Sequence, residues 1–312
     1  MYKEKRLFSN TFVPLRGLNY HLSSWGDAAS INPALPPLVL VHGWMDVGAS
    51  YQFMVDALSS RFAQGRRIIA PDWRGFGLTA PASGHGGQDS YWTADYLADL
   101  DFLLDHLVPG QPIDLVGHSM GGNIAMMYAG VRPERVRRLV NLEGFGLAAS
   151  QPSQAPSRYA KWMDELKSLH RGDTRLKSYA SADGVAQRLM KTNPRLSLDK
   201  ANWLATHWAR LDASGEWQIL GDAAHKITNA HIYKVDETLE IYRRITAPVL
   251  AVEAADDSLS KWWAGKYTLA EYHERLKTVP SARVSVIADA GHMLHHDQPE
   301  VLAGLIEGFL SD

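Results

Sequence analysis

Short apolar runs recur along this chain, and each ends at small or polar residues. A run of four or five residues with such boundaries is typical of a strand that is buried on both faces of a parallel sheet. The runs occupy residues 38–41, 67–70, 113–116, 138–142, 248–252 and 284–287. Before them, residues 11–14 and 18–25 predict two strands of an antiparallel hairpin, joined at Arg16-Gly17.

Helical periodicity fills the intervals between most of these runs. Apolar residues spaced three or four positions apart predict helices over residues 51–62, 92–107, 122–131 and 299–310. Strand and helix therefore alternate, which favours right-handed crossovers between parallel strands. We predict an α/β fold with a doubly wound, mostly parallel sheet.

One interval, residues 147–235, breaks the alternation. It contains no apolar β run, but helical segments occur around residues 158–170, 185–190 and 199–211, after a linker rich in Pro, Ser and Gln. We predict that this interval is a helical cap, inserted into a core formed by residues 1–146 and 236–312. The cap holds four of the ten tryptophans, which predicts a largely apolar pocket between cap and sheet.

The composition of the chain excludes several classes of function and site. Of the 312 residues, 46% are hydrophobic and 21% are charged, as in soluble globular proteins. A net charge of −2 without a long basic run argues against a nucleic-acid partner. The absence of cysteine excludes disulfides, thiolate metal sites and a cysteine nucleophile. The polar N-terminus and the lack of an apolar run of about 20 residues predict no membrane span and a cytoplasmic location; the sequence does not set the oligomeric state.

The strongest chemical motif is a G-x-S-x-G sequence, Gly117-His118-Ser119-Met120-Gly121, followed by Gly122. It lies directly after the run at 113–116 and before a helical pattern, which is the context of a nucleophile elbow. A serine on such a tight turn is held in a strained conformation, and the glycines avoid collisions with the crossing backbone. We predict that Ser119 is a nucleophile.

A serine hydroxyl requires a base within hydrogen-bond reach and a third group that orients this base. Gly291-His292 lies just after the last predicted strand, in the chain order serine, acid, histidine that suits this architecture. We therefore predict His292 as the base. Backbone N–H groups of Trp44 and Met120 are the expected oxyanion hole, because Trp44 follows the His42-Gly43 turn and Met120 follows the nucleophile.

Four blocks of sequence together resemble the signatures of the α/β-hydrolase superfamily. They are Val41-His42-Gly43-Trp44, Pro71-Asp72-Trp73-Arg74-Gly75-Phe76-Gly77, Gly117 to Gly122 and Gly291-His292. Within the superfamily the pattern is similar to esterases and to serine hydrolase-like proteins. The resemblance covers most of the chain outside the predicted cap and implies a serine esterase acting on a small acyl substrate, without a cofactor.

The resemblance also implies an acid after the run at 248–252. Counting along Ala254-Ala255-Asp256-Asp257 points to Asp257, with Asp256 as a neighbour that could take its place. A rival acid is Glu143, which ends the preceding run, since some members of the superfamily take their acid from that strand. The acid therefore stays open among these three, with Asp257 as the first choice.

Two other functions and a metal site are alternatives to esterase activity. Cofactor-free dioxygenases resemble the chain at its His42 and Asp72 blocks, and a ligand-sensing hydrolase homologue would keep the pocket without rapid turnover. The segment 292–297 contains three histidines, His292, His295 and His296, but no matching set of ligands is evident on another element. We therefore predict no bound metal.

Overall fold

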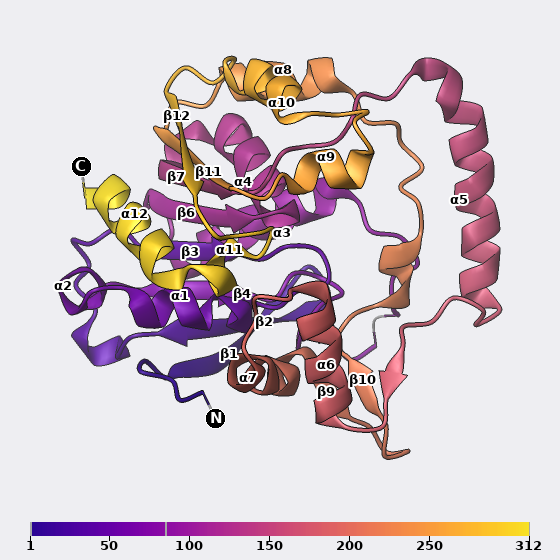
Figure 1. Cartoon of the computed structure of the whole chain (residues 1–312), viewed down its shortest axis with the longest axis horizontal. Helices are drawn as coiled ribbons and strands as arrows, with labels where there is room; N and C mark the ends of the chain where they lie inside the picture. Colours follow the sequence, from indigo (N-terminus) through magenta and orange to yellow (C-terminus); the bar gives the residue numbers. More distant parts are fainter. Residues whose placement is uncertain (1, 85, 312) are drawn as a thin grey trace.

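In the computed structural model, which describes residues 2–84 and 86–311, the apolar runs form a nine-stranded sheet (Figure 1). Eight strands follow one another in the spatial order β1-β2-β4-β3-β6-β7-β11-β12, and β5 pairs with β2 beside this path. The strands are β1 (Phe8–Leu15), β2 (Leu18–Trp25), β3 (Leu38–Val41), β4 (Ile68–Pro71), β5 (Ala80–Pro81), β6 (Ile113–His118), β7 (Val136–Leu142), β11 (Val249–Ala254) and β12 (Ala282–Ile287).

The strand directions agree with the prediction. Strands β4, β3, β6, β7, β11 and β12 pair in parallel, whereas β1 with β2 and β2 with β4 pair antiparallel. The predicted mostly parallel sheet and the N-terminal hairpin are therefore confirmed. Met1, His85 and Asp312, which the predicted core ranges include, lie outside the described residues.

Helices cover both faces of the sheet. Successive side chains of a strand point to opposite faces, so a strand that is apolar throughout presents apolar side chains on both. In β3, Leu38 and Leu40 belong to one apolar core, and Val39 and Val41 belong to the other. The Val39 side carries α3 (Thr93–Leu107), α4 (Met120–Val131), α8 (Val235–Arg243) and α10 (Leu269–Leu276). The Leu38 side carries α1 (Gln52–Ala57), α2 (Ser60–Ala63), α11 (Leu294–Asp297) and α12 (Pro299–Ser311).

The helix predicted over residues 51–62 is interrupted. Helix α1 ends at Ala57, and Ser59 begins α2 as its N-cap, accepting a hydrogen bond from the Phe62 N–H. The hydroxyl of Ser59 also donates to Glu307 of α12 at 2.8 Å. Serine side chains favour helix caps over helix interiors, which is the reason for the break.

The interval 147–235 contains the predicted helices as α5 (Ala155–His170), α6 (Ala182–Thr192) and α7 (Leu198–Trp208). The prediction that it contains no strand was wrong, since β8 (Ser178–Tyr179), β10 (Trp217–Ile219) and β9 (Ala209–Leu211) form a separate small sheet. Strands of two or three residues are too short to show alternation. They also shorten the helix predicted over 199–211, because the backbone becomes extended at Ala209. The proposed domain boundaries stay a prediction.

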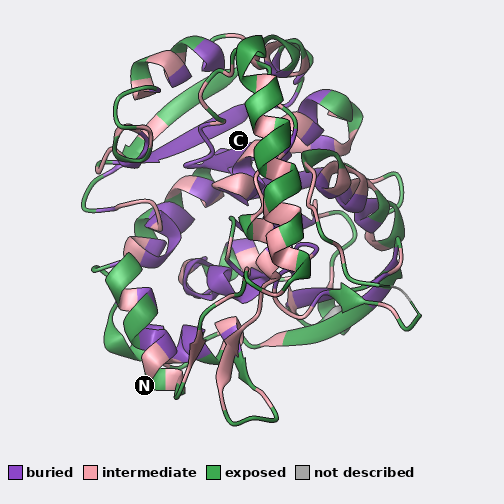
Figure 2. Ribbon diagram, turned by 90° about the vertical axis from the view of Figure 1, so that its right-hand side faces the viewer, coloured by how far each residue is buried: buried purple, intermediate pink, exposed green. Residues whose placement is uncertain are grey.

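Helix α5 has no buried residue and stands at the opposite end of the molecule from α12 (Figures 1 and 2).

The tryptophans of the interval 147–235 have structural contacts. Trp203 packs 5.6 Å from the Phe53 ring, the Trp208 Nε1–H donates to Asp46, and the Trp162 Nε1–H donates to Ser90. No described helix is long and apolar enough to cross a membrane.

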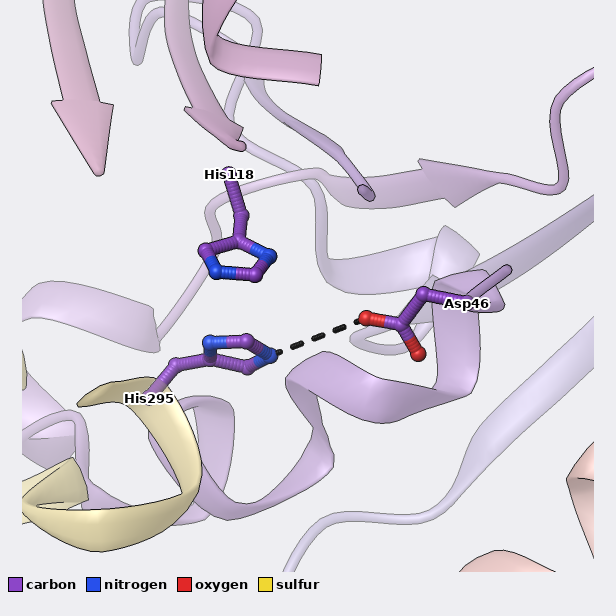
Figure 3. Close-up of side chains that lie close together, drawn as sticks. All are labelled: Asp46, His118 and His295. Atoms are coloured by element: carbon purple, nitrogen blue, oxygen red, sulfur yellow. Dashed lines mark ion pairs between the residues drawn. The ribbon is translucent and has the colours of Figure 1, made fainter. Parts of the chain in front are cut away.

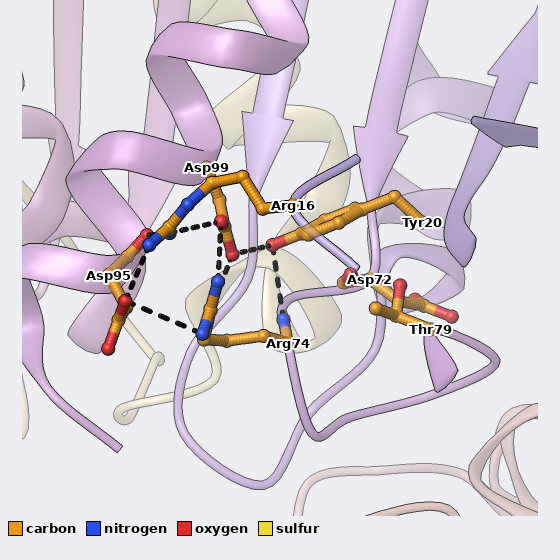
Figure 4. A network of polar contacts seen from close by, with 7 residues as sticks. All are labelled: Arg16, Tyr20, Asp72, Arg74, Thr79, Asp95 and Asp99. Atoms are coloured by element: carbon orange, nitrogen blue, oxygen red, sulfur yellow. Dashed lines mark hydrogen bonds and ion pairs between the residues drawn. The ribbon is translucent and has the colours of Figure 1, made fainter. Parts of the chain in front are cut away.

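A buried polar network fixes the loop that follows β4 (Figure 4). Both nitrogens of the Arg74 fork, Nε and Nη2, donate to Asp99 of α3, at 2.6 and 2.7 Å. Asp99 also accepts from Arg16 and from Tyr20, and the Tyr20 hydroxyl accepts from the Arg74 N–H. A buried carboxylate with this many donors is well satisfied, so the network ties the loop to α3 and to the hairpin.

Candidate active site

Ser119 occupies the sharp turn between β6 and α4. Its φ is 52° and its ψ is −115°, a conformation that residues with a Cβ rarely adopt. The glycines around it allow close approaches of backbone: a Cβ on Gly117 would lie 2.4 Å from the Gly121 carbonyl oxygen, and one on Gly121 would lie 2.2 Å from the Val41 oxygen. The geometry is that of the predicted elbow, with Ser119 at its tip.

His292 lies in the loop between β12 and α11, and its Nδ1 is 3.3 Å from Oε2 of Glu143. Because Glu143 offers acceptors there, the Nδ1–H of His292 donates, and Nε2 keeps its lone pair. His118, the residue before Ser119, also holds the loop of His292, since the Nε2–H of His118 donates to the His292 carbonyl oxygen at 2.7 Å. The turn at Ser119 and the loop at His292 are thus linked directly.

Glu143 directly follows β7 and is 2% exposed. Its φ of 53° turns the chain sharply, while its N–H still donates to Val252 of β11. The carboxylate accepts from the Ala254 N–H at 2.7 Å and from the Ser258 hydroxyl at 2.6 Å. Two donors and the histidine therefore fix the orientation of this carboxylate.

The two aspartates of the predicted acid turn have other partners. Asp257 is the N-cap of α9 (Ser258–Trp263), and its carboxylate accepts from the Ser260 N–H at 2.8 Å. Asp256 forms an ion pair with Arg195 at 3.0 Å, and both side chains are about 40% exposed. The structure thus brings Glu143 to His292, and it places Asp257 at a helix end and Asp256 toward the inserted segment.

Burial sets the protonation of the pair. It lowers the pKa of His292 from 6.5 to about 3, so the ring is neutral at pH 7 and able to take a proton. Burial also raises the pKa of Glu143 to about 7, an effect that the hydrogen bonds from Ser258 and Ala254 partly offset. Such shifts in neighbouring groups within one site are typical of acid–base chemistry.

The expected oxyanion donors lie on either side of the nucleophile. Met120 is the first residue of α4. Trp44 follows Gly43, which lies close to Ser119, since a Cβ added to Gly43 would lie 3.1 Å from the Ser119 Cβ. Within the described part of the chain, neither the Trp44 nor the Met120 N–H donates a hydrogen bond. His42 is structural, since its Nε2 accepts from the Trp73 N–H at 2.9 Å.

A cavity of about 490 Å³ opens at the carboxyl ends of the parallel strands, and Ser119, Met120, Trp44 and Glu143 all line it. Its other walls are mainly apolar and aromatic, among them Tyr96, Ile124, Met127, Phe145, Tyr242 and Trp263. Residues 224–233 of the inserted segment close one side, whereas α5 contributes no lining residue. Among the described lining residues none is Lys or Arg.

Two neighbours of the site are not evident from sequence. Ser258 donates to Glu143 across 115 positions of chain, a contact that no spacing rule reveals. Trp262 is 55% exposed, and its ring meets the His292 ring edge to face at 4.2 Å between centroids. Only the packing of α9 against the loop after β12 brings this ring over the base.

Comparison with known proteins agrees with this fold. The model of the alpha/beta hydrolase fold family matches residues 36–299, and the chain belongs to this family. It is 25% identical over 279 residues to the serine hydrolase-like protein of Danio rerio, which covers 88% of this chain and 81% of that protein. It is 29% identical over 285 residues to 2-hydroxymuconate semialdehyde hydrolase of Pseudomonas putida, covering 88% and 87%.

Among solved structures, the thioesterase domain from the curacin biosynthetic pathway is similar, with a TM-score of 0.77 and 25% identity. The match covers 96% of this chain and 99% of that domain. The names of these relatives point to different substrates, so the family is established while the scissile bond is a separate question.

Proposed function

We propose that the protein is a serine hydrolase that cleaves a carboxylic ester or a related acyl bond through an acyl-enzyme. Ser119 is the nucleophile, His292 the base and Glu143 the acid that orients it. Asp257, the first choice from sequence, is assigned to capping α9. The observation that carries the proposal is the strained Ser119 in a cavity that Glu143 also lines, with Glu143 3.3 Å from the His292 ring.

The geometry supports the following steps. The Oγ of Ser119 bonds to the acyl carbon while its proton passes to Nε2 of His292, and Glu143 stabilises the imidazolium. The N–H groups of Trp44 and Met120 receive the negative oxygen of the tetrahedral intermediate. His292 then returns the proton to the leaving alcohol. In the second half, His292 takes a proton from water, the hydroxide attacks the acyl carbon, and Ser119 leaves with that proton.

The cavity favours an uncharged, apolar acyl group. Its aromatic and aliphatic walls bury apolar surface, and without a Lys or Arg among the described lining residues a substrate carboxylate would have no cationic partner. Burial lowers the pKa of His225, which also lines the cavity, to about 3, so this ring adds no charge. Simple esters or thioesters therefore suit the cavity better than substrates with a free carboxylate.

The test is a burst assay with p-nitrophenyl butyrate on the wild-type chain and on Ser119→Ala, with an oxygen electrode in the same sample. We expect a burst of one p-nitrophenol per chain that vanishes in the variant, with no uptake of oxygen. A wild-type chain without burst or acylation would refute the acyl-enzyme. Oxygen consumption that survives in Ser119→Ala would instead indicate dioxygenase chemistry.

A further inference from the structure

A second group of ionisable side chains, Asp46, His118 and His295, lies close together (Figure 3), and none of them lines the substrate cavity. Asp46, His118 and His295 each present one possible ligand atom, and these atoms lie within 4.8 Å of one another. The Nε2 of His295 is 3.9 Å from Oδ2 of Asp46. The three residues come from the loop after β3, the end of β6 and the start of α11.

All three side chains are buried, with 3%, 1% and 0% exposure for Asp46, His118 and His295. Asp46 Oδ2, His118 Nδ1 and His295 Nδ1 have no hydrogen-bond partner among the described residues. The other ring nitrogen of His295, the Nε2 that faces Asp46, lies 3.3 Å from the Ser50 hydroxyl. An unpaired buried carboxylate oxygen or ring nitrogen costs free energy, and a few such groups in one place require an explanation.

The surrounding contacts prepare Asp46 and His118 as ligands. The Oδ1 of Asp46 accepts from the Val47 N–H at 2.9 Å and from the Trp208 Nε1–H at 3.0 Å, which leaves Oδ2 unused. The Nε2–H of His118 donates to the His292 oxygen, so Nδ1 carries the lone pair. Contacts that fix the tautomer and orientation in this way are typical of metal ligands.

We infer that Asp46, His118 and His295 form a binding site for a divalent transition-metal ion such as Zn²⁺ or Co²⁺. One carboxylate and two imidazoles match the preference of these ions, with water as a fourth ligand. Ligands at about 2.1 Å from a tetrahedral ion lie about 3.4 Å apart, so atoms that now lie within 4.8 Å of one another must approach by up to about 1.4 Å.

The fold thus brings together a set of possible metal ligands that the sequence did not reveal. Segment 292–297 has histidines without a visible partner set, and the partner ligands come from Asp46 and His118, far away in sequence. The ion would join three segments of the candidate active site. Asp46 is two residues after Trp44, His118 precedes Ser119, and His295 is three residues after His292. Occupancy is therefore expected to raise the thermal stability of the chain.

The test uses the full chain after treatment with a chelator, titrated with Co²⁺ and, separately, with Zn²⁺ in a calorimeter. We expect one ion per chain, the intense visible absorption of four-coordinate Co²⁺, and a rise in Tm with Zn²⁺. His295→Gln and Asp46→Asn should each weaken binding by about 100-fold or more, because each removes one of three ligands. Ser119→Ala should bind normally, which separates this site from the proposed esterase activity.

Two histidine variants serve as controls. His296→Gln alters the residue next to His295; the Nε2 of His296 contacts Ser50 at 2.7 Å. His170→Gln alters an exposed histidine next to Asp89. Both should keep the affinity of the wild-type chain. Binding that His170→Gln abolishes, a weak absorption typical of six-coordinate Co²⁺, or no binding at all would overturn the inference. If the ligand variants do not fold, the wild-type Co²⁺ spectrum alone decides.

Discussion

Replacement of Glu143 by Gln tests the assignment of the acid most directly. The carboxylate is surrounded by three donors: the Ala254 N–H, the Ser258 hydroxyl and the His292 Nδ1–H. Glutamine keeps the shape of glutamate but replaces one acceptor by an NH₂ donor. If this NH₂ faces His292, the ring must place its proton on Nε2, and it can then no longer take the proton of Ser119.

The expected magnitude follows from the lost charge. A carboxylate 3.3 Å from an imidazolium is worth about 5 kcal/mol at an effective dielectric constant of about 20. Because each 1.36 kcal/mol is a factor of about ten in rate, kcat should fall by about 10³ to 10⁴. The change in KM should be small, since the imidazolium exists only as the reaction proceeds.

The assay is steady-state and burst kinetics with p-nitrophenyl butyrate, with circular dichroism and Tm as folding controls. Asp257→Asn is the matched control, because asparagine caps helices about as well as aspartate and should keep the bond to the Ser260 N–H. We expect its kcat to stay within about threefold of wild type. A folded Asp257→Asn that loses activity by 10³, beside an active Glu143→Gln, would refute the assignment.

Two further predictions concern pH and stability. Since burial raises the pKa of Glu143 to about 7 and the reaction needs its carboxylate, kcat/KM should fall as pH decreases through about 7. Ser258→Ala removes a hydrogen bond that lowers this pKa, so the acid limb of the pH profile should move to higher pH; an unmoved limb would contradict the role of Ser258. Asp99→Asn should cost about 3 to 5 kcal/mol in the free energy of unfolding, because it removes the buried carboxylate that Arg74 contacts and leaves only a longer pair with the partly exposed Asp95. Asp105→Asn on the same helix breaks an exposed pair with Arg135 and should cost at most about 1 kcal/mol in chemical denaturation; equal losses would argue against the buried network.

The sheet was predictable because its strands carry their own pattern. Runs buried on both faces, such as residues 38–41, need no partner to be recognised. The elbow was predictable for a related reason, since the glycines, the serine and the flanking elements are all local in sequence. The small sheet of β8, β9 and β10 escaped because two or three residues do not define a period.

The contacts of the candidate acids could not be predicted from the sequence, and Asp257 as first choice stays an untested prediction. Glu143 and Asp257 follow β7 and β11, which are neighbours in the sheet, so both are delivered to the same edge. A count along the turn favours Asp257, but it cannot show that α9 begins there and engages its carboxylate. The Glu143–His292 contact spans 149 positions, and it depends on how two loops pack.

Backbone strain points to the same residues as the side-chain contacts. In the described chain six non-glycine residues have positive φ, and two of them, Ser119 and Glu143, directly follow β6 and β7. Strain of this kind persists only where neighbouring structure holds it, and here the sheet extends its hydrogen bonds by one residue. The Ser119 N–H donates to Leu142, and the Glu143 N–H donates to Val252. Because Ser119 and Glu143 are each bonded to the adjacent strand, one rigid edge positions the proposed nucleophile and the proposed acid, as an oriented triad requires.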